Sequence, residues 1–352
     1  MLKHCQFLLL SCLLLNSNNL VAKQSKELVF LNWTSYIAPN VVKKFEDKFK
    51  VKVRIIEFED DEARDKLLLE SKKPLYDLAI IDGTRIKSYQ QRGWLTSITH
   101  KQVINLKDIE QRWKDAFPAS NGYAVPYFWG TLGIAYRKDK VPALFEHWID
   151  IFEPKGALKS LLKGKIIIPK SGRDSIGAAL KALGSSWNSQ SPKELKQAHK
   201  LLLKQRPLLH AYGYPELDKS SNLLNGKVLA AIMYNGDALM LKDLSPNIAF
   251  SIPQEGTSLW VDYLVVFKSS EKKQLAFDFI KFLNSPKIAA ENAEYVHFAT
   301  PNKQAYLHLS QAMKNDKYVY PEQRILNKSV FQKRLPPRVI RRYYLIMADL
   351  LQ

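Results

Sequence analysis

Short runs of apolar residues alternate along the chain with stretches in which apolar residues recur at helical spacing. A bounded apolar run is typical of a buried strand, and apolar residues three or four positions apart are typical of a helix with one buried face. A further strand is predicted where apolar and polar residues alternate over 51–58. The buried strands predicted from apolar runs are 28–31, 76–81, 165–168, 228–234 and 263–267.

The predicted helices fall between these strands. The dipeptide Pro39-Asn40 opens one that ends near Phe49, and Ser285-Pro286 opens a late one. The segment 191–194, Ser-Pro-Lys-Glu, has the form of a capping box and predicts a helix to about Gln205. Two shorter helices are predicted at 65–70 and 176–183. The alternation of strands and helices predicts an α/β protein with a mainly parallel sheet.

Residues 1–22 have the pattern of an export signal. Lys3 precedes an apolar run over 5–15, and Ala22 is a small residue at the expected cleavage site. The run is too short to cross a bilayer as a helix. A buried N-terminal helix is the alternative interpretation, but the charged start and small-residue end favour a cleaved signal peptide.

Both cysteines of the chain, Cys5 and Cys12, lie inside this segment, so the exported protein would contain no disulfide. Residues 9–12 loosely resemble a lipoprotein cleavage box, which would anchor lipid at Cys12. The apolar run continues past that cysteine and argues against this alternative. We therefore expect an exported, periplasmic protein.

The charge of the chain points in another direction. Its 352 residues carry a net charge of +19, with 46% hydrophobic and 25% charged residues, which is an ordinary globular composition for one large domain or two. A basic surplus indicates a nucleic-acid or anionic-surface binder. The segment 303–352 supports this weakly, with ten Lys or Arg against three Asp or Glu. Export makes nucleic acid a poor partner, and we expect none.

A search for catalytic motifs finds none. There is no phosphate-binding loop, no dinucleotide fingerprint and no nucleophile elbow, and the seven histidines are scattered without metal-ligand spacing. No cysteine nucleophile would survive export. We therefore expect neither an enzyme, nor a metal site, nor a cofactor, although an enzyme on a similar scaffold stays an open alternative.

Aromatic residues stand beside polar or acidic ones at several strand ends. In open α/β sheets, ligands bind outside the carboxyl ends of the strands. Aromatic faces attract cations, and a buried ammonium also needs a carboxylate. Such a combination would select an organic cation, although each residue alone could be a core, turn or capping residue. The segments concerned are 32–36, 81–84, 234–237 and 260–263.

Two neighbouring features have simpler interpretations. Thr34 could cap the helix that follows it. The acidic cluster over 57–62 is expected to be a solvated loop and helix N-terminus rather than a cation site.

At these segments the chain resembles the periplasmic spermidine/putrescine-binding proteins, the substrate-binding components of polyamine ABC importers. The resemblance covers nearly the whole exported chain and is most specific where two motifs occur together. These are Asn-Trp-Thr-Ser-Tyr at 32–36 and Pro-Tyr-Phe-Trp-Gly at 126–130; further matches lie at 76–78, 234–236, 260–262, 300–302 and 320–321.

The resemblance implies a two-lobed periplasmic binding protein whose lobes close on a ligand. It places one lobe at 27–130 and 262–305, the other at 131–261 and 306–352, with crossings at 128–130 and 259–262. It also implies a monomer that captures spermidine or putrescine and delivers it to an ABC permease in the inner membrane. Another organic cation stays open as the ligand.

Site residues implied by the resemblance fall in both lobes. Trp33, Thr34 and Tyr36 match the first binding segment and supply an aromatic wall and polar contacts. Trp260 and Asp262 match a pair whose aromatic packs on the methylene chain and whose acid holds an amine. The remaining implied contacts are Gln332, Tyr234 in place of a tryptophan, Asp174 as a shortened acid, and Asp237 where putrescine-type members carry an acid.

Three positions depart from the family pattern. Asp82 stands in place of a serine, Thr84 in place of an aromatic, and Ser171 in place of an acid. One carboxylate is thus lost, and Asp82 and Asp237 are the candidates to replace it. A polyamine would approach this site against the long-range field of a basic protein, so capture should depend on the local carboxylates.

Overall fold

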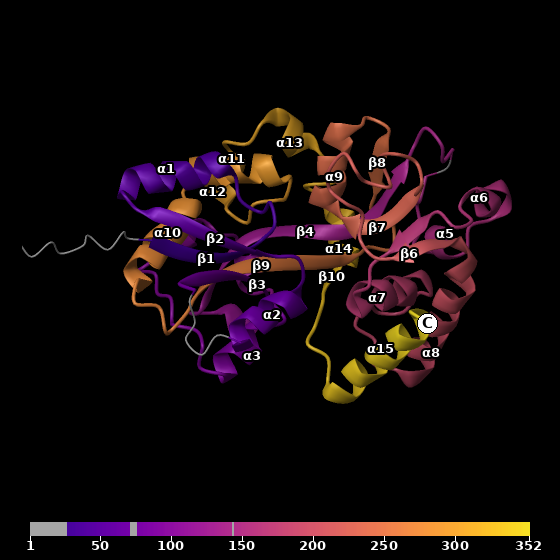
Figure 1. Ribbon diagram of the computed structural model, residues 1–352, viewed down its shortest axis with the longest axis horizontal. Coiled ribbons are helices and arrows are strands. Elements are labelled where there is room, and N and C mark those ends of the chain that lie inside the picture. The colour runs from indigo at the N-terminus through magenta and orange to yellow at the C-terminus, as the bar shows by residue number, and fades with distance from the viewer. Residues whose placement is uncertain (1–26, 71–75, 143) are drawn as a thin grey trace, which may run out of the picture.

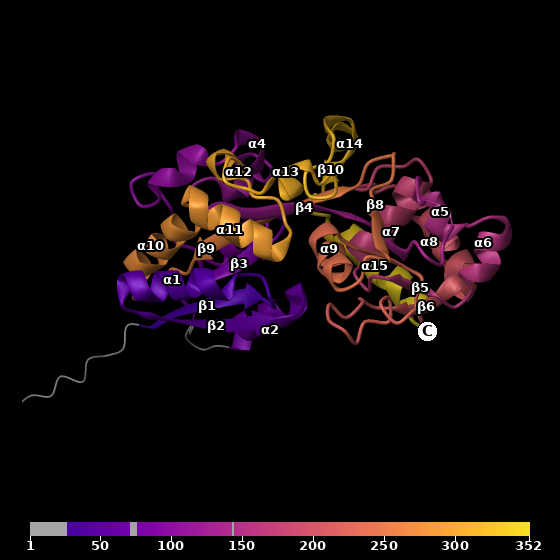
Figure 2. The same cartoon turned by 90° about the horizontal axis from the view of Figure 1, so that it is seen from above.

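The computed structural model describes residues 27–70, 76–142 and 144–352; the predicted signal peptide and Cys12 lie outside them. Two lobes lie side by side, and two long strands run from one to the other (Figures 1 and 2). Within the described residues, no helix is long and apolar enough to cross a membrane.

The first lobe is built around three parallel strands. β1 (Glu27–Trp33) lies between β2 (Lys52–Phe58) and β3 (Leu78–Asp82). Apolar side chains from these strands and from helices on the faces of the sheet form one buried cluster. The helices of this lobe are α1 (Pro39–Phe49), α2 (Asp61–Glu70), α3 (Ile86–Gln91), η1 (Ile104–Asp108), α4 (Gln111–Lys114), η2 (Pro118–Ser120), α10 (Lys273–Leu283), α11 (Pro286–Val296), α12 (Lys303–Tyr306) and α13 (Gln311–Asn315).

The second lobe repeats this plan around β5 (Ile166–Ile168), which lies parallel between β6 (Leu209–Tyr212) and β7 (Ala230–Tyr234). The last helix, α15 (Pro337–Leu350), packs on α7 and α8 and closes the larger of two buried clusters. The other elements of this lobe and its border are α5 (Ile149–Phe152), α6 (Gly156–Leu161), α7 (Gly172–Ala182), α8 (Pro192–Gln205), η3 (Arg206–Leu208), α9 (Asn235–Leu244), β8 (Ile248–Ser251), α14 (Gln323–Lys328) and β10 (Val330–Phe331).

Two antiparallel strands join the lobes. β4 (Ala124–Arg137) pairs with β9 (Ser258–Val266) over its first half and with β7 and β8 over its second half. β9 also pairs antiparallel with β3. The sheet is therefore mixed, parallel within each lobe and antiparallel where the lobes join. This confirms the expectation of a mainly parallel sheet in each lobe, and the antiparallel pairs are those of the crossing strands β4 and β9.

The predicted strands all correspond to observed ones. Two details of the prediction are wrong: the start of β9 and the capping box of α8. β9 begins at Ser258 rather than at 263, since Trp260 and Asp262 break the apolar run without ending the strand. The capping box of α8 is only half formed. The Ser191 side chain accepts from the Glu194 N–H at 3.4 Å, but the Glu194 carboxylate accepts from Ser189 instead.

The buried clusters bear on the lobe boundaries, which remain proposals. Leu309, Met313 and Val319 pack in the cluster of the first lobe, although the expected division assigns 306–352 to the second. We propose that the last crossing lies beyond Val319, between α13 and the second-lobe packing of α15 (Figure 1).

A glycine at the crossing makes room for a tryptophan. Gly130 on β4 pairs with Trp260 on β9, and a Cβ at Gly130 would lie 2.6 Å from the Trp260 ring and 2.4 Å from Asn235 Oδ1. The same Asn235 oxygen accepts the Thr131 N–H at 3.0 Å, so it cannot move away without losing that bond.

We therefore expect Gly130→Ala to lower the melting temperature by about 2–8 °C through overpacking at the crossing. Gly213→Ala is the matched control, because nothing lies within 4 Å of a Cβ there. Thermal unfolding followed by circular dichroism checks both variants. Equal melting temperatures for the two would contradict the packing argument.

Candidate functional site

Two aspartates face each other where β3 meets β9. Asp82 and Asp262 are direct partners in this antiparallel pair, so their side chains stand on the same face of the sheet. Trp260 lies two residues before Asp262 and shares that face, since side chains alternate along a strand. The crossing strand β9 therefore presents an aromatic ring and a carboxylate together, beside a second carboxylate from β3.

Aromatic rings form a continuous row beside these acids. The Tyr36 ring contacts Phe298 edge-on at 5.6 Å between centroids, Phe298 contacts Trp260 at 4.8 Å, and Trp260 contacts Tyr234 at 5.9 Å. Tyr36 comes from the loop after β1, and Tyr234 from the end of β7. The row thus runs from the first lobe through the crossing strand to the second lobe.

Asp262 is a buried carboxylate of unusual basicity. It is 8% exposed, and it forms no ion pair with any residue in the described part of the chain. Burial, reinforced by the charges of Asp82 and Asp61, raises the pKa of Asp262 to about 8. The Tyr36 hydroxyl lowers the pKa of Asp262 and so opposes the effect of burial. Burial and the Asp262 charge in turn raise the pKa of Tyr36.

The second lobe contributes a hydrogen-bonded acid. Asp174, in the first turn of α7, accepts from Gln332 Nε2 at 2.8 Å and from the Tyr234 hydroxyl at 3.0 Å. Burial raises the pKa of Asp174, and these two hydrogen bonds oppose the rise. Three of the predicted site residues thus form one network, although they come from α7, β7 and the segment after β10.

Asp237 lies in the first turn of α9 and accepts a hydrogen bond from Tyr214. Burial raises the pKa of Asp237 to about 6, against the effect of this bond. The charges of Asp61 and Asp262 help to raise the pKa of Tyr234, and the charge of Asp237 helps to raise the pKa of Tyr36. Acids from both lobes therefore surround the aromatic row.

Three predicted site residues have other surroundings. The Trp33 ring packs against Phe58 in a tilted arrangement with centroids 4.4 Å apart, and Thr34 is exposed. α1 begins at Pro39 with Ala38 as its N-cap, so Thr34 is not a helix cap. Thr84 donates its N–H at 2.8 Å, and also its hydroxyl, to Asp82.

The acidic cluster is a loop and helix N-terminus, as expected, and Asp61, the first residue of α2, is half-buried beside Arg64. Burial raises the pKa of Asp61 to about 6 even beside the Arg64 guanidinium, which lies 2.6 Å away. The pattern analysis also passed over Arg64, Arg85 and Phe298. A buried arginine one turn into a helix carries no distinctive sequence signal, so only the packing reveals it.

Several buried polar atoms at the site lack a hydrogen-bond partner among the described residues. They include Nε1 of Trp260, the Tyr36 hydroxyl and Oδ2 of Asp82. Such atoms are rare in folded proteins and are usually satisfied by water or ligand. A ligand bound at the aromatic row could supply partners for these three atoms.

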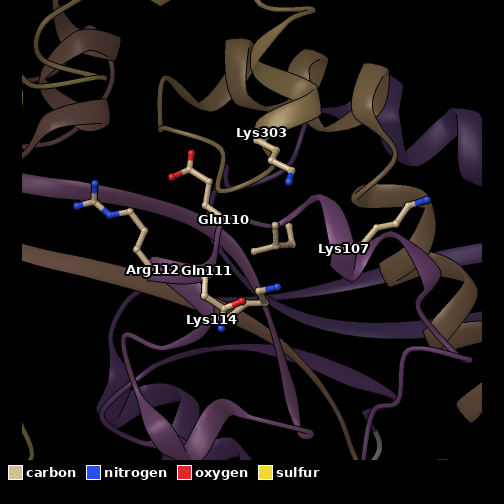
Figure 3. A pocket seen from close by; sticks show the side chains of 7 residues that line it. Lys107, Glu110, Gln111, Arg112, Lys114 and Lys303 are labelled. Atoms are coloured by element: carbon tan, nitrogen blue, oxygen red, sulfur yellow. The ribbon is translucent and has the colours of Figure 1, made fainter.

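A separate hollow lies on the first lobe (Figure 3). Side chains of Lys107, Glu110, Arg112, Lys114 and Lys303 surround it, and none of its lining residues belongs to the site above. Its cations suit an anion rather than an organic cation. Within the described residues, no group of three or more His, Cys, Asp or Glu side chains could hold a metal ion.

The chain is similar in sequence to known proteins. The Pseudomonas aeruginosa putrescine-binding periplasmic protein SpuD is 30% identical over 91% of this chain and 90% of its own length. The Vibrio cholerae norspermidine sensor is 31% identical over 90% of this chain and 86% of its own length.

The chain is also similar to solved structures. The spermidine/putrescine ABC transporter substrate-binding protein PotD of Streptococcus pneumoniae superposes with a TM-score of 0.80 at 26% identity, covering 93% of this chain and 98% of its own. The sequence profile of the bacterial extracellular solute-binding proteins matches residues 40–320. The chain, a two-lobed α/β protein, therefore belongs to the family of bacterial extracellular solute-binding proteins.

Proposed function

We propose that this protein is the periplasmic substrate-binding component of a polyamine ABC importer. It captures a polyamine of the spermidine or putrescine type between its lobes, as a monomer, and delivers it to a permease in the inner membrane. The relatives above, whose names include polyamines, support the class of ligand. At identities of 26–31%, these relatives do not determine the amine, and its choice depends on this chain's own residues.

The single observation that carries the proposal is the state of Asp262. A buried carboxylate without a cation partner is costly, and the cost is expressed as its raised pKa. A ligand ammonium would supply the missing charge. The rings of Trp260 and Tyr36 on either side would cover the methylene chain and attract the cation.

The other site residues complete these roles. Asp174, held by Gln332 and Tyr234, supplies a second acid on the opposite lobe. A ligand that contacts both acids would bridge the lobes and favour their closed arrangement, because only that arrangement offers both contacts at once. No bond in the ligand is made or broken.

We expect Asp262→Asn to weaken the binding of putrescine and spermidine at least about tenfold, because it removes the charge but keeps the shape. Isothermal titration calorimetry measures the effect. Asp47→Asn is the control, since Asp47 is exposed and pairs only with Lys43 on the surface. If neither amine binds the unaltered protein, the proposal fails.

Binding should also depend on pH. The raised pKa of Asp262, about 8, means that the ligand-free site holds a proton at neutral pH. An ammonium favours the ionised form, so binding expels that proton. Affinity should rise by up to about tenfold per unit between pH 6 and 8 and then level off until the amines lose their charge near pH 10.

Calorimetry in buffers of different ionisation enthalpy counts the released protons. Since the folded pKa lies above the unfolded value of about 4, Asp262 should make the ligand-free protein less stable as pH rises from about 4 to 8. Saturating ligand should remove that decline. An affinity that is constant between pH 6 and 8 would contradict this assignment.

A further inference from the structure

Asp82 and Asp262 have the same backbone setting but different neighbours. They are direct partners on β3 and β9 and share a face of the sheet. Asp82 Oδ2 lies 3.9 Å from Nη2 of Arg64 and 3.7 Å from Nε of Arg85. Asp262 has no such partner among the described residues. The protein thus neutralises one carboxylate of the pair itself and leaves the other to a ligand.

Arg64 is held firmly in this arrangement. Its side chain is fully buried between the rings of Phe58 and Tyr89, whose centroids lie 5.4 Å and 5.8 Å from the guanidinium carbon. Nε donates to the Tyr89 hydroxyl at 3.0 Å, and Nη1 pairs with Asp61 at 2.6 Å. Burial alone would lower the pKa of Arg64, but the surrounding carboxylates, Asp61 foremost, raise it, so its charge is permanent.

Arg85 extends the charge toward the site. It follows β3 directly and pairs with Asp65, with Asp61 at 3.6 Å and with Glu62 at 3.4 Å, in addition to Asp82. Its side chain is 30% exposed, whereas that of Arg64 is buried. Arg85 is therefore the more accessible member of the pair.

A third guanidinium approaches from the other lobe. Arg173 of α7 donates to Gln332 Oε1 at 3.1 Å and to the Lys333 carbonyl at 2.6 Å. Burial lowers the pKa of Arg173. The charge of Asp82 opposes this effect, and the charge of Arg85 adds to it. Arginines from both lobes therefore converge on the Asp82 end of the site.

We propose that Arg85, braced by Arg64, is a specificity-determining residue that occupies the Asp82 end of the site as an internal cation, so that the protein selects a diamine over a triamine. The inference rests on the proposed function. A ligand ammonium can pair with Asp262 and a second with the acids of the other lobe. A third ammonium would find Asp82 already paired with the guanidinium groups of Arg64 and Arg85, so it would meet no free carboxylate at this end of the site.

The test compares putrescine, which has two ammonium groups, with spermidine, which has three. Isothermal titration calorimetry on the full exported chain should show putrescine binding at least about tenfold more tightly than spermidine. Arg85→Gln removes the internal cation and exposes the charge of Asp82. The ratio of the two affinities should then shift at least about tenfold toward spermidine.

Two further variants keep the result interpretable. Arg85→Lys retains the charge, so it should retain the preference for putrescine even if packing changes. Arg92 is an exposed arginine at the C-terminal end of α3, the helix whose N-terminal end is at Arg85. Arg92→Gln should leave the ratio of the two affinities unaltered. Melting curves establish that each variant is folded.

Two outcomes would overturn the inference: equal affinity of the unaltered protein for the two amines, or an Arg85→Gln variant that changes both affinities by the same factor. Both differ from failure of the proposed function, in which no amine binds any variant. A preference that survives Arg85→Gln but disappears in Arg85→Lys would also overturn it, because the size of the side chain and not its charge would then decide.

Discussion

The site depends on one electrostatic constraint: two carboxylates on adjacent strands of a buried sheet. Asp82 and Asp262 cannot both be ionised there without positive charge nearby. The protein meets half of this requirement with Arg64 and Arg85 and holds a proton on Asp262 for the rest. In the proposed function, an ammonium group of the ligand supplies the missing positive charge.

The crossing strands explain why this constraint is linked to the lobes. β9 carries Trp260 and Asp262 at the point where it pairs with β3 on one side and with β4 on the other. Gly130 on β4 leaves the space that the Trp260 ring fills. Packing at the crossing therefore sets the position of the ring and of the carboxylate together. Any change in the relation of the lobes would move Asp174 and Tyr234 relative to a fixed Asp262.

The net charge of the chain turned out to be a poor guide to the ligand. A surplus of nineteen positive charges indicated an anionic partner, yet the candidate site and its border contain five aspartates, two buried and three half-buried. Surface charges act over a distance that salt shortens to about 10 Å, whereas buried groups interact at close range with little screening. The lysines and the arginine around the hollow on the first lobe are surface charges of this kind (Figure 3).

The sequence by itself determined the α/β class, the positions of the parallel strands and most of the acids and aromatics of the site. Apolar runs and strand-end polar residues are local patterns, and 260–262 and 234–237 could be read from them. Only the tertiary structure decided that Asp82 pairs with two arginines, that Asp61 is half-buried beside Arg64, and that Asp262 has no cation partner among the described residues. These outcomes depend on a register between β3 and β9, nearly two hundred residues apart in the chain, and on an arginine buried between two rings. Local patterns carry no information on such long-range pairing, and it is this pairing that sets the charge a ligand must bring.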